Sequence, residues 1–136
     1  MKRGLNEMAK DIHELAVIKG WWDGGEGKSL PEILMLCVSE LSEALEEYRD
    51  GKPTLYYYCK SHDTRLNCPD KYDGCQHGKN AGCSNRKPQG IAAELADCII
   101  RILDYCAWVG IDIEEVIATK HEHNKSRPYR HGGKVC

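Results

Sequence analysis

Residues 91–109, IAAELADCIIRILDYCAWV, decide the fold of this chain. Apolar residues recur three and four positions apart, and they cover most of the circumference of the helix that this stretch predicts. A helix that is apolar on nearly all sides must be enclosed by other helices. Gly110 tolerates the left-handed conformation that is common just after a helix, and it is expected to end the segment. The polar residues form one narrow stripe of Glu94, Asp97, Arg101 and Asp104.

Three further segments of helical pattern predict that the chain is an all-α, four-helix bundle. The first helix is expected over about residues 5–19 and ends at Gly20. The second runs from about Ser29 to Asp50, and the fourth begins after Asp112, which caps its N-terminus. A chain of 136 residues accommodates one compact domain rather than two.

The composition predicts a cytoplasmic protein with reduced thiols. No apolar run approaches the roughly 20 residues that cross a bilayer, and the first ten residues lack the apolar stretch of a signal peptide. The net charge of −2 gives no long-range attraction to nucleic acid or to anionic membranes, so neither is expected as a partner. Three cysteines fall in apolar helical patterns, where a thiol behaves as a small hydrophobe: Cys37, Cys98 and Cys106.

Residues 51–88, between the second and third predicted helices, predict an irregular, basic insert. They show no sustained period and are rich in Gly, Asn, Asp, Pro and Cys. Seven Lys or Arg against three Asp give a net charge of +4, which leaves −6 for the remainder of the chain. The cysteines of this insert could hold a structural Zn²⁺, with free or redox-labile thiols as the alternative, because zinc sites typically space cysteines by two to four residues. The candidates are Cys59, Cys68, Cys75 and Cys83, with His62 and His77 nearby.

Two pairs of carboxylates lie beside the apolar faces of the second and third predicted helices. Glu40 and Glu43 stand three residues apart on one helix, and Glu94 and Asp97 stand three apart on the other. Like charges at close range repel, so a cation between the packed helices would stabilise the arrangement. Mg²⁺ prefers oxygen ligands, as does Mn²⁺. A metal site and two solvated acidic stripes are therefore the alternatives, since acidic helix faces are common.

Three ordered motifs carry a resemblance to a known family. The segments LCVSELSEALEEYRDG (residues 36–51) and GIAAELADCIIRILDYCAWVGIDIEEVIATKHEHNKSRPYRHG (residues 90–132) resemble the MazG-like branch of the all-α NTP pyrophosphatase superfamily. That family shows Glu-x-x-Glu, then Glu-x-x-Asp, then a Lys with an Asn-x-x-Arg-like element, each on a successive helix. The matching residues are Glu40, Glu43, Glu94, Asp97, Lys120, Asn124 and Arg127. Many members carry a further glutamate where this chain has Ser39, and Glu47 could contribute in its place.

The resemblance implies Mg²⁺-dependent hydrolysis of nucleoside triphosphates, ribo or deoxy, to monophosphate and pyrophosphate. A metal-activated water would attack, and Glu43 would position or deprotonate it. Lys120, Asn124 and Arg127 follow one another at i, i+4 and i+7 and would bind the polyphosphate. The alternative for this set is a basic turn that complements the helix dipole.

A base-binding pair is also implied by the resemblance. In related nucleotide hydrolases, a His on the first helix and an aromatic residue nine positions later contact the base. His13 and Trp22 have this spacing, and Trp21 is then expected to fill the core.

The apolar third helix needs more cover than one four-helix chain offers, which predicts a homodimer or homotetramer with sites near the subunit interface. Two other classes of function stay open. One is a zinc-stabilised module whose basic, tyrosine-containing insert binds nucleic acid or protein. The other is a helical partner protein without catalysis. Turnover of a nucleoside triphosphate distinguishes the enzyme from both.

Overall fold

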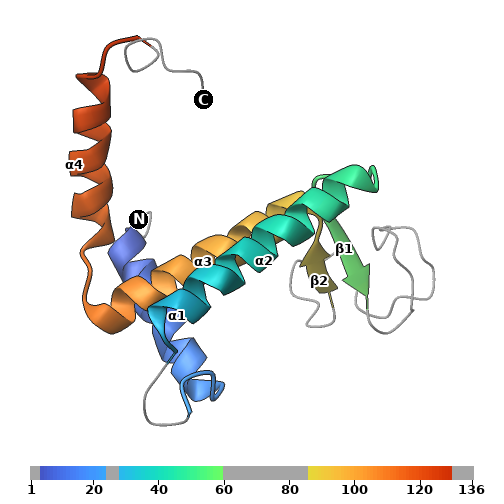
Figure 1. Cartoon of the computed structure of the whole chain (residues 1–136). Helices are drawn as coiled ribbons and strands as arrows, with labels where there is room; N and C mark the ends of the chain where they lie inside the picture. The colour runs from blue at the N-terminus through green and yellow to red at the C-terminus, as the bar shows by residue number, and fades with distance from the viewer. Residues whose placement is uncertain (1–3, 24–27, 60–85, 130–136) are drawn as a thin grey trace. The chain divides into compact units, whose positions relative to one another are not determined.

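The computed structural model describes residues 4–23, 28–59 and 86–129, and it is mostly helical, as the sequence predicts. Its four helices are α1 (Leu5–Ile18), α2 (Leu30–Arg49), α3 (Ile91–Val109) and α4 (Ile113–Lys125), and two short strands, β1 (Tyr56–Cys59) and β2 (Arg86–Gln89), accompany them (Figure 1). The predicted helix limits agree closely with these bounds. Within the described ranges, none of the helices combines the length and the apolar character that crossing a membrane requires.

The chain divides into two compact units. One comprises Met1–Leu30 and Ile100–Cys136, and the other comprises Pro31–Ile99. Helix α3 is continuous across the boundary, so its first half belongs to the second unit and its second half to the first.

The two ends of the predicted irregular insert form an antiparallel ladder. Tyr56 lies opposite Gln89, and Cys59 lies opposite Arg86. The expectation of an irregular insert is therefore wrong at these ends. The aromatic β1 has strand propensity, but β2 contains Pro88, which cannot donate to a ladder and argues against a strand in the sequence. β2 therefore forms because it pairs with β1 in the folded chain, and not because its own sequence favours a strand.

Gly90 fixes the passage from β2 into α3. Its φ of +97° is a conformation that glycine adopts without steric cost. A Cβ at this position would lie 2.7 Å from the carbonyl oxygen of Pro53. The backbone passes this close because the amide of Ala92 donates a 2.9 Å hydrogen bond to the carbonyl of Thr54. The contact places Glu94 in the first turn of α3.

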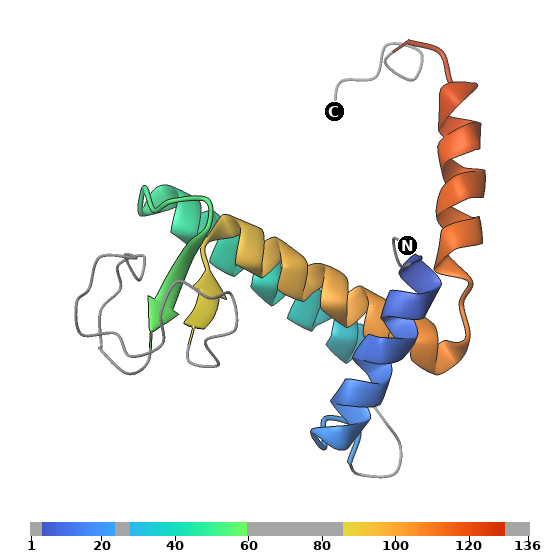
Figure 2. The same ribbon diagram turned by 180° about the vertical axis from the view of Figure 1, so that it is seen from behind.

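Within the 31–99 unit, α2 and the first half of α3 lie side by side in both views (Figures 1 and 2). The Sγ atom of Cys37 lies 3.9 Å from the carbonyl oxygen of Cys98, which bonds the two helices within the 31–99 unit. Both thiols are buried and outside any disulfide, as expected for cysteines that pack as small hydrophobes. Among the described residues of this unit, the buried apolar ones are Ile33, Cys37, Ala44, Tyr56, Ala93 and Cys98.

In the other unit, Asn6 of α1 bonds to the start of α4. Its Nδ2 donates to Oδ1 of Asp112 at 2.7 Å, and its Oδ1 accepts from the backbone N–H of Ile113 at 3.1 Å. Asp112 also accepts from the backbone N–H of Glu115 at 3.0 Å, which confirms the predicted helix cap. In the described part of this unit, the buried apolar residues are Ala9, Ala16, Leu103 and Cys106.

Apolar stripes on α2 and α3 remain exposed in the single chain. On α2 the stripe recurs at alternating steps of four and three residues, and its members are 48–71% exposed: Leu34, Val38, Leu41, Leu45 and Tyr48. On α3 the members are 41–53% exposed: Leu95, Ile99 and Ile102. The enclosure predicted for α3 is thus incomplete within the part of one chain that the structure describes.

Candidate functional site

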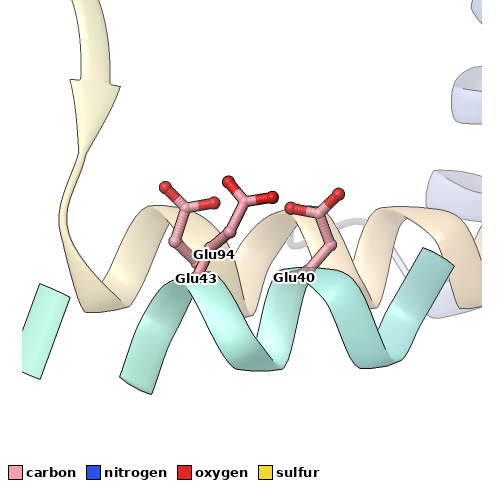
Figure 3. Close-up of side chains that lie close together, drawn as sticks. All are labelled: Glu40, Glu43 and Glu94. Atoms are coloured by element: carbon pink, nitrogen blue, oxygen red, sulfur yellow. The ribbon is translucent and has the colours of Figure 1, made fainter. Parts of the chain in front are cut away.

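Three carboxylates from two helices converge in the 31–99 unit. Glu40 and Glu43 come from α2 and Glu94 from α3, and one oxygen of each lies within 4.8 Å of the others. All three side chains point to the same side of the helix pair (Figure 3). Three of the four predicted metal ligands are therefore brought together.

The local sequence explains this convergence. Glu40 and Glu43 stand about one helical turn apart and so share a face of α2. Glu94 follows Gly90 by four residues, and its backbone N–H donates to the carbonyl of Gly90 at 3.2 Å. Burial differs among the three: Glu40 is 6% exposed, Glu94 is intermediate and Glu43 is exposed. The hydroxyl of Ser39 donates to Oε1 of Glu43 at 3.5 Å.

The cluster carries unfavourable electrostatics. Burial, which removes water from the carboxylate, is the main cause that raises the pKa of Glu94 above its ordinary value. The negative charges of Glu43, Asp97 and Glu40 raise this pKa further. Lys87, on β2, partly opposes the shift. A cation bound among these oxygens would relieve the repulsion.

The donor set fits a hard divalent cation. Carboxylate oxygens are the ligands that Mg²⁺ and Mn²⁺ prefer, and a partly exposed cluster leaves room for the waters that Mg²⁺ retains. Asp97 is exposed and does not belong to the group within 4.8 Å, although its charge acts on Glu94. The structure therefore does not bring Asp97, the fourth predicted ligand, together with the other three.

Glu47 is engaged elsewhere. Its Oε1 lies 3.1 Å from Nζ of Lys52, and its Oε2 accepts a 3.1 Å hydrogen bond from the hydroxyl of Tyr56. These two contacts occupy both carboxylate oxygens. Glu47 therefore bonds to Tyr56, the first residue of β1, and does not join the three clustered carboxylates.

The predicted base-binding pair meets at a buried carboxylate in the other unit. Nδ1 of His13 lies 2.7 Å from Oδ1 of Asp104, and Nε1 of Trp22 donates to both Asp104 oxygens at 3.1 Å. The ring of Trp22 also packs against Trp108, with centroids 4.7 Å apart. Trp21 is 57% exposed, so the expectation that Trp21 fills the core is wrong, and Trp22 is the packed tryptophan.

Sequence reasoning missed Asp104 and Trp108 as partners of this pair. The available signal was the position of Asp104, a carboxylate on the narrow polar stripe of a helix that is apolar on its other sides. Such a group must find hydrogen-bond donors when it is buried, but the sequence does not say which.

The predicted phosphate-binding residues lie at the C-terminal part of α4 and just after it. Lys120 and Asn124 are exposed residues of α4. Arg127 is also exposed, but it follows the last helical residue, Lys125, and its backbone N–H donates to the carbonyl of Asn124 at 3.2 Å. The expected single helix face thus holds Lys120 and Asn124, while Arg127 extends from the turn beyond it. This set belongs to the unit with α1, whereas the clustered carboxylates belong to the 31–99 unit.

The zinc hypothesis concerns residues that are largely outside the described part. Cys68, Cys75 and Cys83, with His62 and His77, fall in residues 60–85, and for Cys59 only the backbone of β1 is described. The possible structural zinc site therefore stays a prediction of the sequence.

Comparison with protein-family models, curated proteins and solved structures finds no match to this chain. The resemblance to MazG-like proteins therefore rests on the three ordered motifs themselves.

Proposed function

We propose that the protein is a Mg²⁺-dependent hydrolase that converts nucleoside triphosphates, ribo or deoxy, to monophosphate and pyrophosphate. The convergence of Glu40, Glu43 and Glu94 within 4.8 Å carries the proposal. The order of the motifs along the chain supports it, because the same residues are those that match the MazG-like pattern.

Burial suggests different roles for the carboxylates. Glu40 is buried and would hold the metal together with Glu94, and Asp97 would add negative charge at the edge of the cluster. Glu43 is exposed and is thus the member best placed to accept a proton from an attacking water. When bound, Mg²⁺ supplies a lowered pKa for bound water and neutralises charge on phosphate oxygens. Manganese could substitute, since it takes the same oxygen ligands.

The exposed side chains of Lys120, Asn124 and Arg127 are proposed to bind the polyphosphate. Two cations and an amide suit phosphate oxygens, and the guanidinium of Arg127 can bind two oxygens at once. His13 and Trp22 are proposed to contact the base.

Turnover of single triphosphates tests the proposal. Each NTP and dNTP is incubated with Mg²⁺, and monophosphate and pyrophosphate are measured for the wild type, Glu40→Gln and Glu94→Gln. Both variants are expected to lose about 100-fold or more in rate, because ligand loss weakens both the metal and its charge stabilisation. Glu46→Gln is the matched control, since Glu46 lies on α2 and pairs with Arg49 at the surface.

Two results would count against the assignment. Unchanged turnover in the Glu40 and Glu94 variants would remove the three carboxylates from the mechanism. No turnover of any triphosphate by the wild type would favour a binding protein, for which metal analysis of the purified chain would decide whether zinc is present.

The exposed stripes of α2 and α3 support a homodimer or homotetramer. The four-and-three spacing of Leu34, Val38, Leu41, Leu45 and Tyr48 is the spacing of a helix-packing seam. We propose that a second copy of the chain covers it. Sedimentation should show an oligomer that Leu41→Glu dissociates, whereas Ser42→Glu, next to the stripe, leaves it intact. A monomeric wild type would contradict this.

A further inference from the structure

The β1–β2 ladder is bonded to both helices that carry the clustered carboxylates. The hydroxyl of Tyr56, the first residue of β1, donates to Glu47 of α2 at 3.1 Å. The backbone N–H of Ala92, in the first turn of α3, donates at 2.9 Å to the carbonyl of Thr54, two residues before β1. Both helix segments and the ladder belong to one compact unit, so the ladder has a fixed position beside the carboxylates.

The register of the ladder places Lys87 on the face that is turned toward α2. Tyr56 lies opposite Gln89, and opposed residues of an antiparallel pair point to the same face. Residues two apart on a strand also share a face, so Lys87 lies on the face of Gln89 and Tyr56. Tyr56 contacts α2 through Glu47. Figure 3 shows the strand that leads into α3 rising on the side of the helix pair to which the three carboxylates point.

The charge of Lys87 acts on the carboxylate cluster. Among the charges that shift the pKa of Glu94, those of Glu43, Asp97 and Glu40 raise it, whereas that of Lys87 lowers it. The Lys87 side chain is exposed, so its ammonium is also accessible to a ligand from solvent. The insert therefore contributes a positive charge to the surroundings of an otherwise acidic site.

The other basic side chains that are described in this unit are already paired. Nη1 of Arg49 lies 3.0 Å from Oε1 of Glu46, and Nζ of Lys52 lies 3.1 Å from Oε1 of Glu47. For Lys87, by contrast, no hydrogen bond or ion pair is formed within the described part of the chain. An ammonium has three N–H donors and binds phosphate oxygens as a compact charge.

We propose that Lys87 binds the polyphosphate at the carboxylate site and repels the metal ion as long as the polyphosphate is absent. The inference rests on the proposed function in taking a divalent cation and a polyphosphate as the ligands. Two cations at short range repel each other, but a polyphosphate between them attracts both. Lys87 thereby makes the binding of metal and polyphosphate cooperative, and each ligand raises the affinity for the other by the same factor.

Two calorimetric titrations of the full chain, each made with the wild type and with Lys87→Met, test the proposal without hydrolysis. The first titrates Mn²⁺ alone, and Lys87→Met should bind it about threefold more tightly, because the repulsion is lost. The second titrates inorganic triphosphate as its Mn²⁺ complex, and Lys87→Met should bind it about tenfold more weakly, because a charged hydrogen bond is lost. A residue that only supports the fold would weaken both affinities.

Two further variants control for charge and for position. Lys87→Arg keeps the positive charge and should retain both wild-type affinities within about twofold. Arg49→Met removes an exposed cation of α2 that pairs with Glu46, and it should change neither affinity. If Lys87→Met does not fold, Lys87→Gln replaces it, because it also removes the charge.

The possible results separate this inference from the proposed hydrolase. The inference is wrong if the wild type does not bind Mn²⁺, if either affinity of Lys87→Met equals that of the wild type, or if both fall. Turnover of nucleoside triphosphates is measured in parallel. The two opposite shifts without any turnover would support the role of Lys87 and reject the hydrolase, whereas turnover with unchanged affinities would do the reverse.

Discussion

The hydroxyl of Tyr56 donates a 3.1 Å hydrogen bond to Glu47, which connects strand β1 to helix α2. Tyr56 is 8% exposed, and the other oxygen of Glu47 lies 3.1 Å from Nζ of Lys52. The strand is thereby bonded to the same helix that supplies two of the three clustered carboxylates.

Removing this hydroxyl should destabilise the protein modestly. Tyr56→Phe is expected to lower the free energy of unfolding by about 1 kcal/mol, because Glu47 loses one of its two hydrogen-bond partners. Urea denaturation measures the change. Tyr48→Phe, on a side chain that is 71% exposed, should stay within about 0.5 kcal/mol of the wild type. Equal losses in the two variants would show that the Tyr56 contact contributes nothing.

Glu94 should make the metal-free protein less stable as the pH rises. Burial and neighbouring carboxylates raise its pKa, so the folded chain holds this proton more tightly than the unfolded chain does. The contribution to stability is complete below the unfolded pKa, about 4.3, and is lost as the pH rises through the folded value. Glu94→Gln should therefore raise the melting temperature in EDTA at about pH 8 and have little effect at about pH 3.5.

Calorimetric melting over this pH range measures the effect. Glu46→Gln, at an exposed pair with Arg49, should show no comparable gain at high pH. A Glu94 variant that melts below the wild type at about pH 8 would mean that burial and repulsion of the Glu94 charge do not destabilise the folded chain.

Divalent metal should stabilise the folded chain through the same carboxylates. Mg²⁺ or Mn²⁺ at about 100 times its dissociation constant is expected to add about 2.7 kcal/mol, reversibly by EDTA. Glu40→Gln should remove most of this gain, because the buried ligand is lost. Melting curves with and without metal provide the measurement, and Glu46→Gln should retain the response. Stabilisation of equal size in the Glu40 variant would place the metal elsewhere.

Gly90 should tolerate substitution less well than Gly51. Both have positive φ, +97° and +65°, but a Cβ on Gly90 would meet the carbonyl oxygens of Pro53 and Thr54 at 2.7 and 2.8 Å, whereas Gly51 has nothing within 4 Å. Gly51→Ala should cost about 1 kcal/mol from backbone strain alone. Gly90→Ala should cost more, about 3 kcal/mol, since the backbone must also shift. Chemical denaturation compares the two, and a smaller loss for Gly90→Ala would contradict the crowding.

The helices could be predicted from sequence because their signals are local. Periodicity, the Asp112 cap and the glycine stops at Gly20 and Gly110 act within a few residues of each helix end. The clustering of Glu40, Glu43 and Glu94 could be expected as well, because each motif has a fixed helical spacing and both helices were expected to pack.

Contacts between distant segments could not be predicted in the same way. The partner of β1 is a proline-containing segment without strand pattern, and only tertiary pairing reveals it. Which of Trp21 and Trp22 packs inward depends on the turn after Gly20, whose φ of +77° redirects the chain. The hydrogen bonds of Asp104 could not be predicted either, because its partners His13 and Trp22 are more than eighty residues away in the chain.

The buried thiols should react slowly with reagents while the protein is folded. Cys37, Cys98 and Cys106 are shielded from solvent, and burial raises the pKa of Cys106 above its usual value. Because the thiolate is the reactive form, alkylating agents and peroxides should reach these sulfurs only during transient opening of the core. The rate at which these thiols are modified would therefore report how often the core opens.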